Sequence, residues 1–367
     1  MKKQILFIVA LCLCSVGTLS SCKDTPAPSS STSTPPTTTT MYFPPINSTD
    51  WQTVSPSSLA WNETELNNLY PYLQQKNTKA FIILKNGKIV AEKYFGTFTA
   101  DSLWYWASAG KTMTGLLVGI AQQEKLLNIN EMSSKYLGIG WTSLPVEKEN
   151  LITIRHQLTM TTGLSDAGDD DCTLRICLQY KADAGTRWAY HNAPYTMLDK
   201  VIEKASGMSF NTYFQQKIRD KIGMNGTWFR SGYNNVYASN ARSMARFGLL
   251  LLNKGKWDTN NILNDENYFT NQTTSSQTLN LSYGYLTWLN GKTSFMLPTI
   301  QTVFAGAMIP NAPTDMYVAL GKNDQKIYVV PSQNLVIIRM GETAGGISLA
   351  ASGFDNELWG RLKTIIK

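Results

Sequence analysis

Residues 104–115 read WYWASAGKTMTG and contain a Ser-x-x-Lys motif that runs from Ser108 to Lys111. If a helix starts at Ser108, Lys111 lies one turn further along the same face, beside the serine hydroxyl. An amine in that place can activate a serine as a nucleophile. The motif alone has little specificity, because Ser20-Ser21-Cys22-Lys23 has the same spacing. Only the motif at Ser108–Lys111 is followed by apolar residues at helical spacing, namely Met113, Leu116, Leu117, Ile120 and Ala121.

Residues 1–22 have the features of a bacterial lipoprotein signal peptide. Two lysines precede an apolar core, Ile5 to Val16, that is too short to span a membrane. The following Leu19-Ser20-Ser21-Cys22 resembles a lipobox, in which the cysteine is acylated. We therefore expect Cys22 to anchor the protein in the cell envelope, on the periplasmic face of a membrane or at the cell surface. A plain secretory signal is the alternative.

A Ser/Thr/Pro-rich linker follows the signal. Residues 23–40 are almost entirely of these three types, and such a segment stays extended as a tether that reaches up to ~50 Å. We place the linker at residues 23–45 and a folded domain at 46–367. About 327 residues after residue 40 exceed what one core usually holds, so we expect two lobes.

Charge excludes one class of partner. The formal net charge is +7, and +5 remains without the two signal lysines. No basic run or basic helix stripe is present, so we do not expect nucleic acid to bind.

Two cysteines remain outside the signal and the lipid site, Cys172 and Cys177. Cysteines this close together in an exported protein favour a local disulfide. Two free buried thiols are the alternative.

Periodicity predicts an α+β architecture. Apolar strands at Ala80–Lys85 and Lys88–Tyr94 flank Asn86-Gly87, a strong hairpin signal. Amphipathic helices are predicted at 62–73, 193–206, 241–252 and 355–366, and further strands at 315–320, 326–330 and 335–340. An antiparallel sheet therefore takes strands from both chain ends, roughly residues 75–105 and 295–367, around an inserted, mainly helical lobe at roughly 106–294.

The sequence lacks the residues that other kinds of catalytic or binding site would need. A Ser-His-Asp triad has only His156 and His191 to draw on, and no Gly-x-Ser-x-Gly elbow exists. No His-Glu-x-x-His zinc motif occurs, and the acidic run 169–171 lacks calcium-loop spacing. Gly110-Lys111-Thr112 is not a phosphate loop, because Tyr105 stands where the first loop glycine belongs. We expect no metal and no cofactor.

A second motif gives the serine a family context. Residues 185–192 read GTRWAYHN, and Ser108-Ala109-Gly110-Lys111 precedes them. Together they resemble the first two motifs of the serine β-lactamase and penicillin-binding protein superfamily, most closely its branch of class C β-lactamases, esterases and 6-aminohexanoate-dimer hydrolases. Tyr233-Asn234-Asn235 matches the bare Tyr-x-Asn tripeptide but lacks the surrounding pattern.

The resemblance implies a β-lactamase/transpeptidase-like fold and an acyl-enzyme on Ser108. Lys111 and Tyr190 would activate the serine, and the sequence leaves open which of them is the base. Asn192 would contact substrate, and Trp188, two residues before Tyr190, is predicted to face it.

The third motif departs from the family pattern. The family usually has Lys-Thr-Gly or His-x-Gly on the strand that faces the serine, and this chain places Ala319-Leu320-Gly321 there. The side chain that helps to hold a substrate carboxylate is thus absent, which argues against lactamase activity. Gly321 is kept, and Lys322 is expected to give a backbone N–H to the oxyanion hole beside that of Ser108.

The sequence thus predicts a lipid-anchored serine hydrolase that cleaves small ester, amide or peptide substrates. Esterase or amidase activity is the first reading. The alternatives are a D-amino-acid or cell-wall peptidase, a β-lactamase, or a penicillin-binding sensor of the same fold without turnover.

Overall fold

The structure, a computed structural model, describes residues 40–346 and 352–366. The predicted signal peptide, Cys22 and nearly all of the linker lie outside the described residues. Residues 40–367 form one compact unit. Within the described residues, no helix has both the length and the apolar character needed to cross a membrane.

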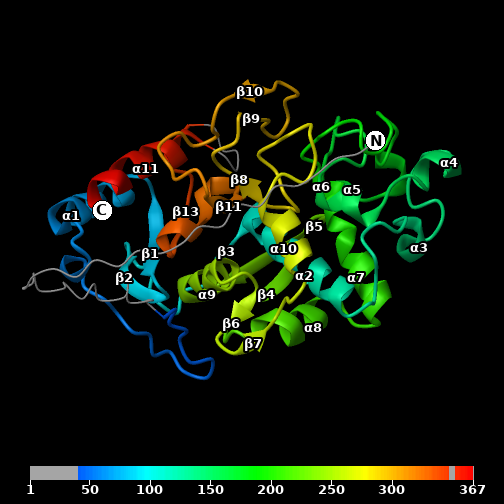
Figure 1. The fold of residues 1–367 in the computed structure, drawn as a ribbon. Coiled ribbons are helices and arrows are strands. Elements are labelled where there is room, and N and C mark those ends of the chain that lie inside the picture. The colour runs from blue at the N-terminus through cyan, green and yellow to red at the C-terminus, as the bar shows by residue number, and fades with distance from the viewer. Residues whose placement is uncertain (1–39, 347–351, 367) are drawn as a thin grey trace, which may run out of the picture. The chain divides into compact units, whose positions relative to one another are not determined.

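One antiparallel sheet joins the two ends of this unit (Figure 1). Its strand order is β2-β1-β13-β12-β11-β8, so strands near the start of the chain pair directly with the last one. The bounds are β1 Thr78–Lys85, β2 Lys88–Tyr94, β8 Trp288–Leu289, β11 Tyr317–Gly321, β12 Gln325–Val330 and β13 Leu335–Gly341. The predicted strands are confirmed to within about two residues at their ends, as is usual for ends read from a pattern.

The β1–β2 turn follows from its two residues. Asn86 and Gly87 have φ values of 51° and 81°, the left-handed pair that a two-residue hairpin needs. A side chain at Gly87 would overlap the Tyr42 carbonyl oxygen, so only glycine fits against the N-terminal segment.

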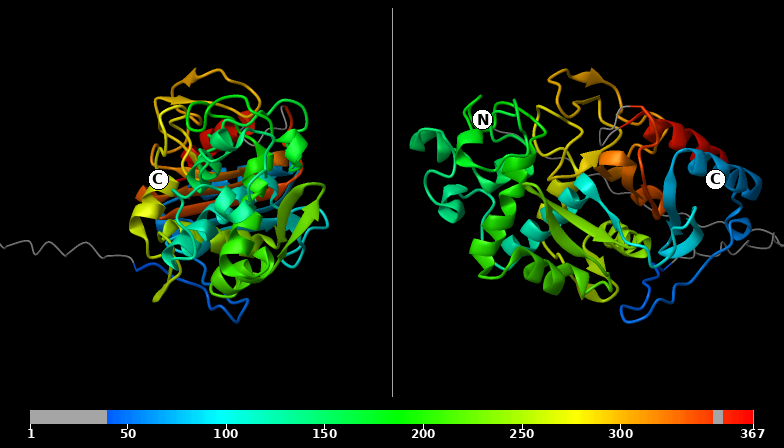
Figure 2. Two further views of the ribbon diagram at one scale, coloured as in Figure 1. Left: turned by 90° about the vertical axis from the view of Figure 1, so that its right-hand side faces the viewer. Right: turned by 180° about the vertical axis from the view of Figure 1, so that it is seen from behind.

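Helices cover both faces of the sheet. α1 (Glu63–Gln75) and α11 (Gly353–Ile365) lie side by side although they come from opposite chain ends (Figures 1 and 2). Asn62 caps α1 by accepting the Glu65 N–H at 3.2 Å, as the sequence predicted. α9 (Ala241–Leu252) packs against β1, β12 and β13, and Gly248 allows this approach because a side chain there would clash with Val336.

Helices dominate the inserted region, as expected. Besides α9 they are α2 Gly110–Gln123, α3 Ser134–Leu137, α4 Val146–Glu149, α5 Ile154–Leu158, α6 Asn192–Thr196, α7 Leu198–Ser206, α8 Phe210–Phe214 and α10 Glu266–Thr273. The predicted helix 193–206 is divided at Met197 and ends at Gly207, whose φ of 69° suits a helix C-terminus.

The inserted region also holds a sheet that the sequence did not predict. β4 (Thr227–Ser231) and β5 (Asn234–Ser239) form a hairpin, and β5 pairs with β3 (Trp104–Tyr105). The β4–β5 hairpin mixes Asn, Ser and one Arg with aromatic residues and lacks clean apolar alternation, so periodicity could not reveal it. Four further short strands form two separate pairs: β6 Lys256–Trp257 with β7 Asn260–Asn261, and β9 Ser294–Phe295 with β10 Phe304–Ala305.

Two predicted boundaries differ from the structure. The Tyr42 N–H donates to the Asn86 carbonyl at 3.0 Å, and Arg246 donates to the Pro45 carbonyl at 2.8 Å, so residues 41–45 pack on the domain instead of belonging to the linker. β8 joins the large sheet ahead of residue 295, where we placed the return of the sheet lobe. Both contacts are long-range, which sequence periodicity does not register.

Candidate active site

Ser108 lies in a short 3-10 turn, η2 (Ala107–Ala109), directly before α2. The residue before it, Ala107, has a φ of 47°, a strained value for a residue with a side chain. The buried Trp106 holds the turn from behind, because its indole N–H donates to Ser239 Oγ at 2.9 Å and its backbone N–H to the Tyr237 carbonyl at 2.7 Å. Strain fixed by surrounding contacts is typical of a functional position.

Lys111 points at the serine from the first turn of α2. Its Nζ lies 3.0 Å from Ser108 Oγ, and the side chain is only 4% exposed. The ammonium also lies 4.2 Å from the ring centroid of Tyr195 and 5.1 Å from that of Tyr190. Burial lowers the pKa of Lys111 to about 7, although Asp171 and Asp170 act in the opposite direction. The amine is therefore partly neutral at physiological pH.

Tyr190 packs deep in the same region. Its ring stacks on Trp288 with centroids 5.6 Å apart, and its buried hydroxyl has no hydrogen-bond partner of good geometry among the described residues. Burial raises the pKa of Tyr190, and the nearby Ser108 hydroxyl only partly opposes this. A phenol of this kind keeps its proton at neutral pH.

The strand opposite the serine lies where the sequence placed it. Gly321 ends β11 against η2, and a side chain there would overlap the Trp106 carbonyl oxygen and crowd the Ala109 nitrogen. Ala319 is buried in the same strand and brings no charge to the site. Lys322 is exposed and lines the pocket beside Ser108.

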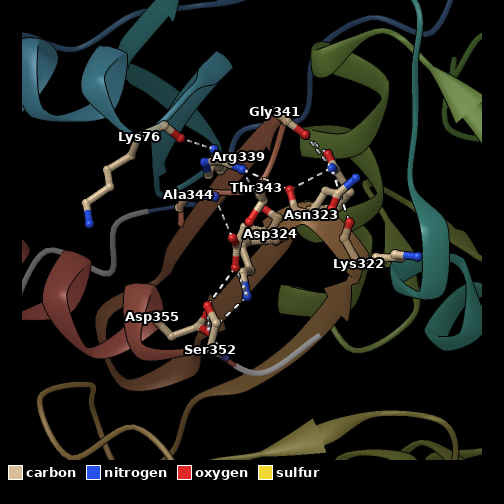
Figure 3. A network of polar contacts seen from close by, with 12 residues as sticks. Lys76, Lys322, Asn323, Asp324, Arg339, Gly341, Thr343, Ala344, Ser352 and Asp355 are labelled. Atoms are coloured by element: carbon tan, nitrogen blue, oxygen red, sulfur yellow. Dashed lines mark hydrogen bonds and ion pairs between the residues drawn. The ribbon is translucent and has the colours of Figure 1, made fainter. Parts of the chain in front are cut away.

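A buried polar network holds the turn that follows Gly321 (Figure 3). The turn is η5 (Lys322–Asp324), in which Asn323 and Asp324 have φ values of 59° and 60°. Arg339 on β13 donates to the carbonyls of Asn323 at 3.2 Å and Asp324 at 2.9 Å. Asn323 Nδ2 also donates to the Tyr105 hydroxyl at 2.7 Å. These contacts fix the backbone of the two residues that directly follow Lys322.

The lower part of this network is an ion cluster (Figure 3). Lys326 Nζ lies 3.2 Å from Asp324 Oδ1 and 2.8 Å from Asp355 Oδ2, and all three side chains are at most 1% exposed. Burial raises the pKa of Asp324, but Lys326 and the Ser352 hydroxyl outweigh it and hold that pKa below its usual value. The cluster ties β12 to α11 behind the turn.

A pocket of about 600 Å³ opens in front of the serine. Its wall includes the β4–β5 hairpin, so Asn234 and Asn235, whose tripeptide we set aside in the sequence, belong to the pocket. The sequence feature that could have identified Asn234 and Asn235 as pocket residues was the bare Tyr-x-Asn tripeptide, which lacks the surrounding family pattern here. Other lining residues include Ser108, Lys111, Asp170, Asp171, Asn192 and Lys322.

Asn192 lies at the pocket, but its amide nitrogen is engaged. Nδ2 donates to Asp171 at 2.8 Å and to Asp170 at 3.3 Å. These carboxylates and that of Asp169 have oxygen atoms within 4.8 Å of one another, a group that could hold a cation. The sequence showed only that the acidic run lacks calcium-loop spacing, and the structure places two of its three members, Asp170 and Asp171, at the candidate site.

The prediction that Trp188 faces substrate is wrong. Its side chain is 1% exposed and lies against Tyr283 and Trp288, with ring centroids 5.6 and 6.1 Å away. Residues two apart in an extended segment point to the same side, but only burial decides which side faces the pocket. Cys172 and Cys177 form a disulfide next to the acidic loop.

Comparison with known proteins supplies the family. The sequence model described as beta-lactamase matches residues 72–357. The chain belongs to this beta-lactamase family. The predicted resemblance to the β-lactamase superfamily is confirmed, and this family match supports the prediction that the protein is an enzyme.

Two solved structures illustrate the shared fold. A putative beta-lactamase from Bacteroides dorei superposes with a TM-score of 0.66 at 16% identity and covers 83% of this chain and 99% of its own. A putative 6-aminohexanoate-dimer hydrolase from Bacillus anthracis has a TM-score of 0.64 at 18% identity and covers 88% of each chain. The predicted β-lactamase/transpeptidase-like fold is confirmed.

One curated relative is more similar in sequence. Teichoic acid D-alanine hydrolase from Staphylococcus aureus is 27% identical over 193 residues. The match covers 48% of this chain and 49% of the relative, so it spans about half the length of each.

Proposed function

We propose that the protein is an exported, lipid-anchored hydrolase that cleaves ester or amide bonds through an acyl-enzyme on Ser108. One observation carries the proposal: Lys111 Nζ lies 3.0 Å from Ser108 Oγ with its pKa lowered to about 7. A buried amine that is partly neutral beside a hydroxyl is the arrangement that a serine nucleophile requires.

In the acylation step, Ser108 Oγ attacks the substrate carbonyl carbon and its proton passes to the neutral Lys111 amine. The negative oxygen that forms is stabilised by the backbone N–H groups of Ser108 and Lys322, each worth roughly 3 kcal/mol in such sites. Tyr190 then donates its phenolic proton to the leaving group as the carbonyl re-forms and the old bond breaks. The Lys111 ammonium returns a proton to the Tyr190 oxygen, which restores both groups.

Deacylation repeats this chemistry with water. Water attacks the acyl carbon, Lys111 accepts the water proton, and Ser108 leaves as the alcohol when it regains a proton. This assigns Lys111 as the base and Tyr190 as the proton donor, because burial disfavours the charged form of both groups.

Esters and amides without a carboxylate beside the scissile bond are the first substrate class. Ala319 offers no cation for such a carboxylate, which supports esterase or amidase activity over β-lactamase activity. The relative whose name specifies D-alanine release supports a D-amino-acid hydrolase as the second candidate.

The test uses the detergent-solubilised full chain and three substrates: a p-nitrophenyl ester, a chromogenic cephalosporin and a D-Ala-D-Ala peptide. We expect hydrolysis of the ester that disappears in Ser108→Ala. Hydrolysis that survives this substitution would remove Ser108 as the nucleophile. Stoichiometric labelling by a fluorophosphonate or a penicillin without turnover would support the sensor alternative instead.

The lipid anchor is a separate part of the proposal and rests on the sequence before residue 23. We expect metabolic labelling with an alkyne-tagged fatty acid to mark the wild-type protein, and Cys22→Ala to abolish the label. A labelled Cys22→Ala variant would show that the lipid is attached elsewhere.

A further inference from the structure

The β4–β5 hairpin has two different faces. Successive side chains of a strand point to opposite sides, and the register pairs Phe229 with Val236. These two side chains therefore share one face, and both residues line the pocket that contains Ser108. Trp228 pairs with Tyr237 on the other face, where the two are 7% and 0% exposed. One face of the hairpin thus belongs to the protein core, and the other is a wall of the pocket.

The core face holds the hairpin against the turn that carries the serine. Trp228 packs on Gly110, where an added Cβ would lie 3.0 Å from the ring carbon Cη2. The Trp106 N–H donates to the Tyr237 carbonyl at 2.7 Å, and β3 pairs with β5 just before the turn (Figure 1). These contacts lie on both sides of Ser108 in the sequence. They fix the position of the pocket wall relative to the nucleophile.

An ion pair holds the outer part of the hairpin. Arg230 follows Phe229 on β4, so its side chain leaves the strand on the face opposite the pocket. Its Nη2 lies 3.1 Å from Oδ2 of Asp199 on α7, a carboxylate that is 0% exposed. Arg230 Nη1 also donates to the Tyr233 carbonyl at 3.2 Å in the hairpin turn. The wall is therefore held in place before a substrate binds, which lowers the cost of binding.

The pocket face of the hairpin is apolar near the serine turn and polar at its tip. Phe229 is 42% exposed, Val236 is half-buried, and Ala107 lines the same pocket. Ser231 and Asn234 form the next pair toward the tip. Other pocket residues are polar or charged, namely Asp170, Asp171, Asn192 and Lys322. An apolar substrate group would therefore gain most against Phe229 and Val236, where contact removes apolar surface from water.

Tyr190 indicates which part of a substrate reaches this wall. In the proposed mechanism Tyr190 protonates the leaving group, which must then lie beside the Tyr190 hydroxyl. Among the described residues, those that line the pocket include Phe229 and Val236 but not Tyr190. The pocket is thus left for the acyl group, which stays bonded to Ser108 after the leaving group has departed.

We propose that Phe229 and Val236 form a subsite for an apolar acyl group, so that the preferred substrates are esters or amides of aliphatic acids longer than acetic acid. The inference rests on the proposed function, because it concerns the acyl group that Ser108 carries. Asp199 and Arg230 act as positioning residues that hold the hairpin from its other face.

The test compares isomeric esters. Methyl butyrate and propyl acetate have the same composition, but the added methylenes lie on the acyl side in the first and on the alcohol side in the second. Methyl acetate is the common reference. The detergent-solubilised full chain is assayed by titration of the released acid at one fixed pH. Each kcat/KM is divided by the rate of hydroxide-catalysed hydrolysis of the same ester.

We expect the corrected kcat/KM to rise about tenfold from methyl acetate to methyl butyrate, since each buried methylene is worth about fourfold, and to rise much less to propyl acetate. Phe229→Ala should reduce the butyrate-to-acetate ratio by about fivefold, and Phe229→Leu should keep most of it. Tyr233→Ala is the matched control, because it removes an aromatic ring from the turn of the same hairpin, outside the pocket lining. Its ratio should equal that of the wild type.

Other outcomes separate the two proposals. Equal corrected rates for methyl acetate and methyl butyrate, both abolished in Ser108→Ala, would overturn the subsite and leave the hydrolase intact. A rise confined to propyl acetate, or a rise to methyl butyrate that Phe229→Ala keeps in full, would also overturn the subsite. Absence of Ser108-dependent hydrolysis of these esters and of the p-nitrophenyl ester would overturn both proposals.

An equilibrium measurement makes the test independent of turnover. Propylboronic acid and methylboronic acid form the same tetrahedral adduct with a serine, and they differ only in methylenes at the position of the acyl chain. We expect the propyl compound to bind about tenfold more tightly to the wild type, and the difference to shrink in Phe229→Ala. Equal binding of the two boronates by the wild type would contradict the proposal even if a variant failed to fold.

Discussion

Two buried lysines in this protein have different surroundings. Lys111 is 4% exposed, and Ser108 Oγ is its polar neighbour at 3.0 Å. Lys326 is fully buried and lies within 3.2 Å of carboxylate oxygens of both Asp324 and Asp355. No carboxylate oxygen of a described residue lies within 4.0 Å of Lys111 Nζ.

The difference shows how one residue type serves two purposes. Carboxylates around Lys326 compensate its buried charge, so the group acts as a structural tie between β12 and α11. Lys111 has only the more distant charges of Asp171 and Asp170, and burial outweighs them and brings its pKa to about 7, where it can accept a proton. The groups around each buried lysine therefore determine whether it forms a structural ion pair or can act as a base.

The largest expected effect comes from Lys111→Met, which keeps the volume and removes the amine. We expect kcat/KM for a p-nitrophenyl ester to fall by about 10³-fold or more, the upper range for loss of an acid–base group. Tm should not decrease, because a desolvated amine is removed. Retention of most of the activity by a folded variant would show that another group is the base.

Lys326→Met should act on stability instead. It leaves Asp324 and Asp355 buried without their cation, and we expect the free energy of unfolding to fall by about 3–5 kcal/mol in urea denaturation. Lys135→Met is the control, since the Lys135–Glu131 pair is on the surface and worth under about 1 kcal/mol. An equal small loss in the two variants would contradict the structural role of Lys326.

The pH dependence of the activity should follow Lys111. Its pKa is lowered to about 7, so the active neutral amine is lost as pH falls through that value. We expect kcat/KM for a neutral ester to be level above about pH 8 and to fall about tenfold per pH unit well below 7. A profile without an inflection between pH 6 and 8 would not be compatible with Lys111 as the base.

The smallest expected effect comes from Asp171→Asn, which changes the charge near Lys111 and so tests how surrounding carboxylates set the pKa of a buried lysine. Asp171 is the strongest charge that raises the pKa of Lys111, so Asp171→Asn should move the midpoint of the pH–rate profile to lower pH. The assay uses methyl butyrate, a neutral ester. Asp169→Asn should leave the midpoint closer to the wild-type value, and a shift to higher pH in Asp171→Asn would refute the assignment.

Local patterns predicted much of the fold. Asn86-Gly87 between two apolar runs fixed a hairpin, and the apolar face of 241–252 gave a helix with the same bounds as α9. These features depend on neighbours in the chain, which a sequence displays directly. The three-stranded sheet with β4 and β5 was missed, because its strands depend on long-range pairing with Trp104–Tyr105.

The candidate site was predicted unevenly for the same reason. Ser108, Lys111 and Gly321 are brought together at η2 and β11, with Tyr190 packed close to the serine. Asn192 lies at the pocket, but its amide nitrogen binds Asp170 and Asp171. Trp188 is in the aromatic core. Which side chain faces the pocket depends on packing by distant segments such as Tyr283–Trp288.

By itself, the sequence determined the chemical groups and their order along the chain: a serine, an amine one helical turn away, a tyrosine in a recognisable context, and a strand that ends in glycine. Only the tertiary structure determined which ionisable side chains are charged and which are neutral. Burial without a carboxylate within 4.0 Å lowers the pKa of Lys111, and burial with two carboxylates in contact makes Lys326 a structural tie. Desolvation and ion pairing depend on atoms that meet only after folding, so the protonation states that the proposed mechanism requires are a property of the fold.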